Sequence, residues 1–341
     1  MVKVHFHLYM NGILSAFLMV ITYALSFILI RKIELRFSTV FINLIRALIG
    51  LCCFVAYNLL TKGFHLIFNL NLRLWGILGA GIIFGMVVGD TAYFKCQMRI
   101  GPTNAATFAI TSPIFTMVLA ILILGHSFQW ILLFSSLLTG AGVYLLVHLQ
   151  KEPDVNHNSP LNVRMDDERE KKELKKKNLL LGSLFGLIAS LAWSFANIYT
   201  EMGMELSEEN LHIGSEITMV TNIIRYIIAT TCMSGWWIMA HSQSKKKKKP
   251  QEHTNIESTP KGRSYSILIF SAILGTFLGE IFFGLTIVQL GSTFIAIMGS
   301  SLPVFTIPLN YIVNKEKIDY KSLPGIIITL AGVLLLIIGT A

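Results

Sequence analysis

The chain has 341 residues, of which 53% are hydrophobic and 14% are charged, whereas about 25% of the residues in ordinary soluble domains are charged. So much apolar surface exceeds what one water-soluble core can bury, which excludes most soluble enzymes. The net charge of +9 does not indicate nucleic-acid binding, because the basic residues lie between long apolar runs rather than on one polar face.

Long apolar stretches dominate the sequence, and a helix needs about 20 mostly apolar residues to cross a bilayer. Ten such stretches occur, at about residues 9–30, 37–60, 74–95, 102–125, 128–148, 179–200, 217–240, 265–289, 291–313 and 322–340. They are continuously apolar and lack the alternation of a barrel strand. The first is too long for the apolar core of a signal peptide, and Arg31 and Lys32 follow it instead of a cleavage site. We therefore predict an all-α integral membrane protein with ten transmembrane helices.

Two polar segments interrupt this pattern. Residues 150–178 mix acidic and basic side chains, and residues 241–264 contain a run of five lysines. Both compositions are typical of solvated, partly disordered loops. The sequence thus predicts a first five-helix repeat at 1–150, a charged cytoplasmic linker at 151–178, and a second repeat at 179–341 that carries the Lys-rich loop.

The two halves resemble each other, which is a common feature of transporters. At an offset of 190 residues and without a gap, the matched pairs include Gly85 with Gly275, Gly89 with Gly279, Asp90 with Glu280, Gly101 with Gly291, and Pro113 with Pro303. An N-x-x-R motif also occurs in the second span, as Asn43 and Arg46, and in the seventh, as Asn222 and Arg225. Because five is an odd number, the second copy enters the membrane from the opposite face. The prediction is two inverted five-helix repeats, the arrangement of alternating-access carriers.

The distribution of Lys and Arg predicts the orientation in the membrane. The loops after odd-numbered spans hold 23 basic residues, and the termini with the remaining loops hold 3. By the positive-inside rule the odd loops are cytoplasmic. We therefore expect a multi-pass protein of the cell membrane with both termini extracytoplasmic, together with the Glu-rich stretch 201–216.

The order of these motifs resembles the EamA-like members of the drug/metabolite transporter superfamily, over nearly the whole chain. The residues that carry the resemblance are Tyr23-Ala-x-x-Phe27, Trp193-Ser, Arg46, Gly101 with Ala106, Gly291 with Ala296, Pro113-x-Phe115, Pro303-x-Phe305, and Lys315-Glu316 leading to Gly325 and Gly332. The resemblance implies that spans five and ten lie peripherally. His126 departs from the pattern, because it stands where Glu316 stands in the second copy. Family members are often drawn with cytoplasmic termini, opposite to the orientation that the charge count favours.

Four charges lie within the predicted spans, and each costs several kcal/mol in hydrocarbon unless it is paired or hydrated. We expect two pairs, Arg46 with Asp90 and Arg225 with Glu280. Each pair either clamps its own repeat or takes part in substrate binding and gating. The candidates for the substrate cavity or the gates are Tyr23, Asn43, Arg46, Asp90, Pro113, Trp193, Asn222, Arg225, Glu280 and Pro303.

The uncharged candidates each have two interpretations. Pro113 and Pro303 interrupt their helices at matched positions, either to line a cavity with freed carbonyls or only to kink the packing. Tyr23 and Trp193 either stack on a ligand or belong to the core. The glycine face formed by Gly81, Gly85 and Gly89, echoed by Ser271, Gly275 and Gly279, indicates close helix packing.

No catalytic motif is present: the sequence contains no H-E-x-x-H, P-loop, G-x-S-x-G or Cys/His ligand cluster. The four cysteines, Cys52, Cys53, Cys96 and Cys232, lie in or beside apolar runs and indicate no metal or redox chemistry. We expect a secondary transporter of a small polar or amphipathic metabolite, with no enzyme activity, cofactor, metal or nucleic-acid partner. A channel, or a scaffold or sensor that acts through the basic loops, is the alternative. The sequence leaves open the coupling proton or ion and a homodimer.

Overall fold

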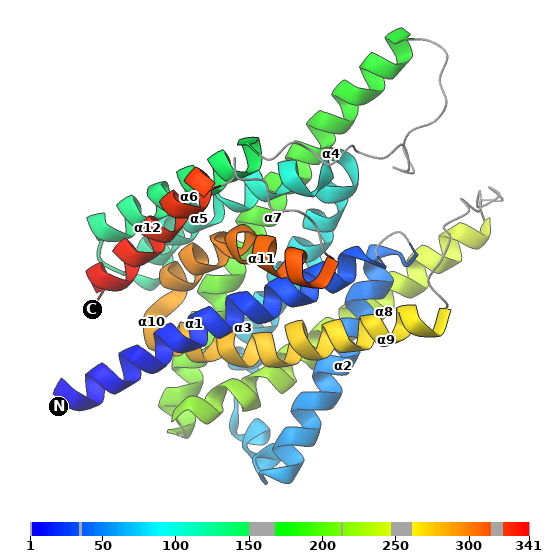
Figure 1. The fold of residues 1–341 in the computed structure, drawn as a ribbon. Coiled ribbons are helices and arrows are strands. Elements are labelled where there is room, and N and C mark those ends of the chain that lie inside the picture. Colours follow the sequence, from blue (N-terminus) through cyan, green and yellow to red (C-terminus); the bar gives the residue numbers. More distant parts are fainter. Residues whose placement is uncertain are drawn as a thin grey trace. The chain divides into compact units, whose positions relative to one another are not determined.

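A computed structural model describes residues 2–33, 36–149, 168–212, 214–246, 261–314 and 323–340. These residues form helices joined by short turns, and no β-strand occurs in the described ranges (Figure 1). The elements of the first half are α1 (Val2–Arg31), α2 (Thr39–Leu60), η1 (Phe64–Asn69), α3 (Leu72–Ile82), η2 (Ile83–Asp90), α4 (Thr91–Ala109), α5 (Ser112–Leu119), η3 (Ala120–Leu124) and α6 (Trp130–Leu149). Those of the second half are α7 (Glu168–Leu211), η4 (Gly214–Glu216), α8 (Ile217–Lys246), α9 (Lys261–Ala272), η5 (Ile273–Gly279), α10 (Glu280–Ser300), α11 (Leu302–Asn314) and α12 (Leu323–Thr340).

Eight described segments are long and apolar enough to cross a membrane, and two shorter apolar helices, Trp130–Leu146 and Leu302–Val313, coincide with predicted spans five and nine. The predicted all-helical architecture is therefore confirmed, with eight to ten apolar helices. The eighth and ninth predicted spans are divided differently, because one apolar segment runs from Gly262 to Ser300. Within it the chain bends at Gly291, where φ is 80°. The chain bends in the same way at the matched Gly101, where φ is 82°, a backbone conformation that glycine adopts without steric cost.

Polar side chains cap two of the helices at their first turns. The Ser38 hydroxyl accepts a 3.3 Å hydrogen bond from the backbone N–H of Phe41 at the start of α2. The Asn71 Oδ1 atom accepts one of 3.0 Å from the N–H of Leu74 at the start of α3. Each cap satisfies a donor that the helix cannot pair internally, which fixes where these apolar runs begin.

The prediction of loops at 150–178 and 241–264 is wrong in part. Residues 168–178 form the first three turns of α7, residues 241–246 end α8, and residues 261–264 begin α9. The rest of both segments lies outside the described residues. Glu and Lys are good helix formers, and Glu173 and Lys177 have the favourable i, i+4 spacing, so a charged segment next to a membrane helix extends that helix.

The chain divides into two compact units, and each contains parts of both sequence halves. Unit 1 comprises Met1–Val87 and Tyr199–Leu290, and unit 2 comprises Val88–Ile198 and Gly291–Ala341. The repeats 1–150 and 179–341 are therefore repeats of sequence and not separate compact bodies.

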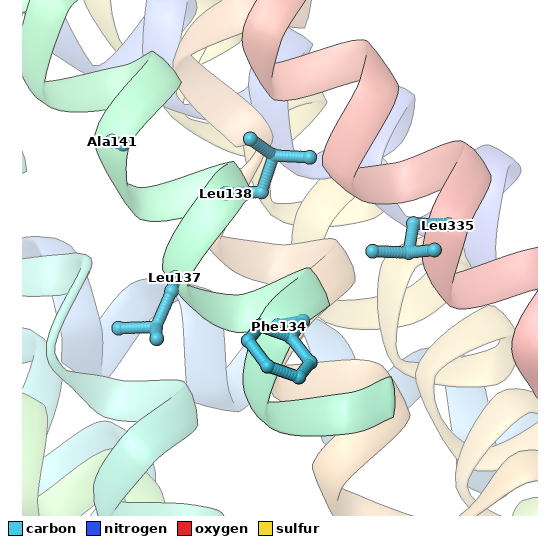
Figure 2. A pocket seen from close by; sticks show the side chains of 5 residues that line it. All are labelled: Phe134, Leu137, Leu138, Ala141 and Leu335. Atoms are coloured by element: carbon cyan, nitrogen blue, oxygen red, sulfur yellow. The ribbon is translucent and has the colours of Figure 1, made fainter. Parts of the chain in front are cut away.

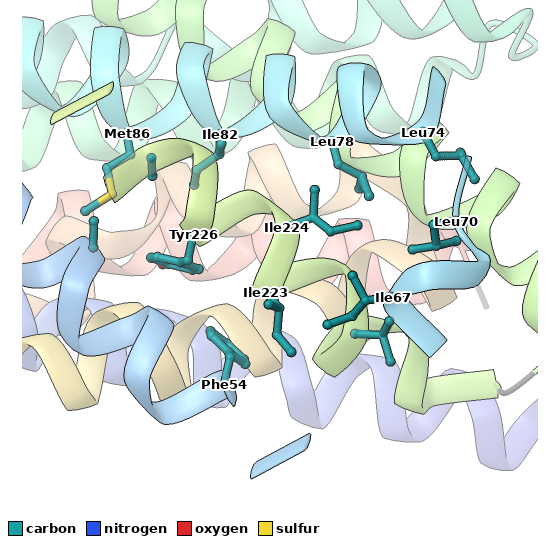
Figure 3. Packing of buried hydrophobic residues seen from close by; sticks show 13 residues of the cluster. Phe54, Ile67, Leu70, Leu74, Leu78, Ile82, Met86, Ile223, Ile224 and Tyr226 are labelled. Atoms are coloured by element: carbon teal, nitrogen blue, oxygen red, sulfur yellow. The ribbon is translucent and has the colours of Figure 1, made fainter. Parts of the chain in front are cut away.

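The core of unit 1 is an apolar cluster between α2, α3 and α8. Phe54 of α2 stacks on Tyr226 of α8 with ring centroids 5.5 Å apart, and Leu78 of α3 packs in the same cluster as Ile224 of α8 (Figure 3). All four side chains are almost fully buried. Burial of such side chains stabilises a fixed rotation of each helix about its axis, which decides which polar residues share a face.

Unit 2 contains a tight pair formed by α6 and α12, which lie side by side (Figure 1). A Cβ atom on Gly142 would overlap the backbone nitrogen of Thr329, and one on Gly332 would lie 2.6 Å from the backbone nitrogen of Thr139. Glycine at these positions therefore lets the two backbones touch, as small residues do in membrane helix pairs.

Candidate functional site

The two N-x-x-R motifs form the same local structure in α2 and α8. Arg46 Nη1 donates a 3.1 Å hydrogen bond to Asn43 Oδ1, and Arg225 Nη1 donates one of 2.6 Å to Asn222 Oδ1. The i, i+3 spacing places each pair on one helix face. All four residues are buried, with at most 4% of each exposed. The amide oxygen compensates part of the cost of removing each guanidinium group from water.

Glu280, the first residue of α10, joins this network in unit 1. Its Oε2 atom lies 2.8 Å from Arg225 Nη1 in an ion pair, and its Oε1 atom accepts a 2.8 Å hydrogen bond from the hydroxyl of Tyr23 in α1. The guanidinium carbon of Arg225 also lies 5.6 Å from the ring centroid of Phe283. The expected contact between Arg225 and Glu280 is present. The hydrogen bond from Tyr23 was not expected, because the sequence offered only ligand stacking or core packing for this ring.

Asp90, the last residue of η2, has an aromatic donor as well. The indole Nε1 of Trp193 in α7 donates a 3.1 Å hydrogen bond to Asp90 Oδ1, and the Trp193 ring lies 5.0 Å from that of Tyr93. Both residues belong to unit 2. Arg46 belongs to unit 1, and its pairing with Asp90 stays a prediction.

Two π-helices occur at matched positions, and the sequence pattern did not predict them: Asp90 is the last residue of one, and Glu280 directly follows the other. The helices are η2 (Ile83–Asp90) and η5 (Ile273–Gly279), and their first residues differ by the same offset of 190 that aligns the repeats. A π-helix is rare and is frequently found at functional sites. Two of the aligned glycine pairs, Gly85 with Gly275 and Gly89 with Gly279, lie in these segments, but the sequence pattern indicated only close packing.

Close packing is nevertheless what the glycines of η5 provide. A Cβ atom on Gly279 would lie 2.6 Å from the Tyr23 ring, and one on Gly275 would overlap Ser26. The Ser26 hydroxyl in turn donates a 2.8 Å hydrogen bond to the carbonyl of Ser271. On the other side of η5, the Thr276 hydroxyl donates a 3.1 Å bond to the carbonyl of Arg46. The π-helix η5 is thus packed against α1 through its glycines and hydrogen-bonded to α2 through Thr276, while Ser26 bonds α1 to the end of α9.

Both candidate prolines lie at the second residue of a helix, Pro113 in α5 and Pro303 in α11. The chain is interrupted just before each of them, as expected, because proline fits the first helical turn, where its missing N–H removes no bond. A row of hydroxyl groups crosses unit 2 at the first break. Thr111 Oγ1 and Ser190 Oγ lie 2.7 Å apart, and Ser194 donates a 3.0 Å bond to the carbonyl of Ser112.

Glu201 is a further buried acid that the sequence analysis placed in an outer loop. Helix α7 continues through Leu211, and only 3% of Glu201 is exposed. The signal that could have revealed it is the spacing of the small residues Thr200, Gly203 and Ser207, which continues the helical packing face past residue 200.

An apolar hollow on unit 2 lies apart from these polar groups. Its lining is aliphatic and aromatic, from α6 and α12: Phe134, Leu137, Leu138, Ala141 and Leu335 (Figure 2). Its walls provide no charged or hydrogen-bonding side chain. The polar candidates for binding a metabolite are therefore those around Glu280 and Asp90.

Comparison with known proteins agrees with this architecture. The model of the EamA-like transporter family matches the chain twice, at residues 10–148 and 180–338. The chain therefore belongs to the EamA-like transporter family. The double match confirms the two sequence repeats, and with the apolar helices it makes the chain a multi-pass membrane protein of a family that transports small molecules.

A solved structure titled "Crystal structure of protein" shares the fold. The TM-score is 0.65 at 13% sequence identity, and the match covers 95% of each chain. At this identity the likeness concerns the fold alone. The comparison with curated proteins finds no match.

Proposed function

We propose that this protein is a secondary transporter, without ATP hydrolysis, that carries a small polar or amphipathic metabolite by alternating access. The observation that supports the proposal best is the pair of matched acid sites. In each, an acid at the end of a π-helix accepts a hydrogen bond from an aromatic side chain in the first helix of the other repeat, Tyr23 to Glu280 and Trp193 to Asp90.

The odd number of helices in each repeat determines on which side of the membrane each of the two acid sites lies. Two copies of a five-helix repeat enter the membrane from opposite faces, so equivalent residues lie toward opposite sides. We place the basic loops in the cytoplasm and the termini outside, as the distribution of Lys and Arg favours. The Asp90 site then lies toward the cytoplasmic mouth and the Glu280 site toward the outer mouth.

Each hydrogen bond would stabilise one closed gate. The bond from Tyr23 ties α1 to the start of α10, and the bond from Trp193 ties α7 to the end of η2. A hydrogen bond to a charged group contributes about 1.5–3 kcal/mol. Moving a two-state equilibrium from mostly one state to mostly the other takes only a few kcal/mol. Breaking one bond is therefore enough to bias which mouth is open.

The substrate class follows from the side chains around the acids. Buried guanidinium and amide groups, together with the partly buried phenol of Tyr23 and indole of Trp193, supply donors and aromatic faces, which suit a small metabolite with acceptor atoms and an apolar part. The charges within the predicted spans are few and widely separated along the sequence rather than arranged as a continuous polar stripe, and this suits gating better than a channel.

Uptake into proteoliposomes tests the proposal. A screen over amino acids, nucleobases, sugars and phosphorylated metabolites, with and without a pH gradient, should find a substrate whose uptake saturates. Preloaded unlabelled substrate should accelerate that uptake, because a carrier exchanges substrate as it returns. Uptake that rises linearly with concentration and shows no such acceleration would indicate a channel.

A further inference from the structure

Two cations of α4 converge on one aromatic ring of α7 in unit 2. Lys95 Nζ lies 5.5 Å from the centroid of the Phe185 ring, and the guanidinium carbon of Arg99 lies 5.6 Å from the same centroid. The i, i+4 spacing places the two cations on one face of α4. The ring attracts each cation, but the cations repel each other. An anion bound between them would relieve that repulsion.

The depth of this cluster follows from where two apolar segments end. One runs from Leu72 to Gly101 and the other from Lys176 to Leu211. Arg99 Nη1 donates a 3.2 Å hydrogen bond to Asn178 Oδ1, which joins the last turn of the first segment to the first turn of the second. The cluster therefore lies at a boundary of the membrane, at the depth of the lipid headgroups, and Lys177 is exposed beside it.

An apolar stripe descends α7 from this boundary. Leu180, Leu184 and Ile188 follow Lys177 at intervals of three to four residues and so share one side of the helix. Their exposed fractions are 71%, 52% and 39%. In a bilayer this stripe faces acyl chains, directly below the cations.

We propose that Lys95, Arg99 and Lys177 bind the headgroup phosphate of an anionic phospholipid, whose acyl chains lie along Leu180, Leu184 and Ile188. The guanidinium group of Arg99 offers a fork for phosphate oxygens, and the lysines add point charges. Glu173 lies one turn before Lys177 at the spacing that suits an ion pair, so Lys177 contributes less than the two cations of α4. A free phosphate ion would make no use of the apolar stripe. The inference is independent of the transport mechanism, since it needs only a membrane-spanning chain.

Lipid binding to the full-length protein tests this site. Protein in nanodiscs of phosphatidylcholine with increasing phosphatidylglycerol is extracted, and native mass spectrometry counts the anionic lipids that remain bound. A cation beside the headgroup of the bound lipid contributes about fivefold to the affinity for that lipid. We therefore expect a loss of about fivefold for Lys95→Ala and for Arg99→Ala. The control is Lys32→Ala, which removes an exposed lysine in unit 1 and should retain the bound lipid.

Three results decide the matter. Equal losses in Lys95→Ala and Lys32→Ala would reduce the effect to general surface charge and overturn the site. Displacement of the lipid by soluble glycerophosphoglycerol as readily as by intact phosphatidylglycerol would make the ligand a free anion and overturn the lipid assignment. Phe185→Leu should weaken binding while leaving the melting temperature in pure phosphatidylcholine unchanged. Lys95→Gln keeps the aliphatic stem and serves as the second variant if the alanine variant melts early.

Discussion

The hydroxyl of Tyr23 donates a 2.8 Å hydrogen bond to Glu280, 257 residues further along the chain. The bond joins the first helix of one repeat to the π-helix region of the other, and Trp193 with Asp90 repeats the relationship in unit 2. Each aromatic residue holds an acid of the other repeat, so the two halves of the sequence are bonded to each other at both sites.

Removing the two aromatic donors should bias the transporter in opposite directions. Tyr23→Phe deletes only the hydroxyl group and should favour opening of the outer mouth. Trp193→Phe deletes the indole N–H and should favour opening of the cytoplasmic mouth. A cysteine at the buried Ala24, in an active variant without Cys52, Cys53, Cys96 and Cys232, reports the change by its labelling rate from each side. The loss of one charge-assisted bond should shift the ratio of the two rates by roughly tenfold.

The control for that experiment is Tyr311→Phe, which removes the hydroxyl of a tyrosine that is 55% exposed. Its labelling should match that of the parent protein. Identical shifts in Tyr23→Phe and Trp193→Phe, or no shift in either, would leave these bonds as structural clamps and remove the gating role.

The ion pair between Arg225 and Glu280 should be essential for transport. Arg225→Ala leaves the partly buried carboxylate of Glu280 with only the Tyr23 hydroxyl among its two described partners, so we expect uptake to fall at least tenfold. The double variant Arg225→Glu with Glu280→Arg should recover part of the activity, since the Asn222 amide can rotate to offer its NH₂ group to a carboxylate. The matched control is Arg73→Ala at an exposed arginine. Normal uptake by Arg225→Ala would show that the pair neither gates nor binds.

The proposed topology predicts which loops an impermeant reagent can reach. In intact cells, a cysteine at Lys171 or at Lys247 should be protected from a membrane-impermeant maleimide, and a cysteine added after Ala341 should be labelled. Permeabilised cells provide the control, because all three positions should then react. Labelling of Lys247→Cys together with protection of the terminal cysteine would reverse the orientation.

The close contact between α6 and α12 predicts that two glycine-to-alanine variants differ in stability. Gly142→Ala places a methyl group against the backbone of Thr329, which cannot move aside as a side chain can, and should cost about 1–3 kcal/mol of stability. Gly235→Ala meets nothing within 4 Å in the middle of α8 and should be neutral or slightly stabilising. Melting temperatures in detergent compare the two. Equal melting temperatures would mean that α6 and α12 do not touch as described.

Much of the architecture could be predicted because it follows from composition and order along the chain. Apolar length locates the spans, and the aligned glycines, prolines and acids reveal the repeats. The contact of Arg225 with Glu280 was predictable because isolated charges in hydrocarbon must find a partner. These arguments need only a residue's type and its approximate depth.

The donors to the acids were not predictable in the same way. Whether Tyr23 reaches Glu280 depends on the rotation of α1 against η5, which close contacts such as that of Gly279 determine. The π-helices leave no mark in the apolar pattern, because the turn widens without changing which residues are hydrophobic. Glu201 was placed in a loop because a charged residue after an apolar run indicates the end of a membrane span, although the spacing of its small neighbours indicates that the helix continues.

The backbone contact between α6 and α12 has a practical consequence. Since Gly142 and Gly332 leave no room for the helices to slide, the pair is the part of unit 2 least able to change its internal spacing. Spin labels at the exposed Phe134 of α6 and Leu334 of α12 should therefore give one narrow distance distribution with or without substrate. That distance would serve as an internal ruler in the same spectra, against which a broadened or shifted distance on any other helix can be recognised as motion of the protein rather than of the label.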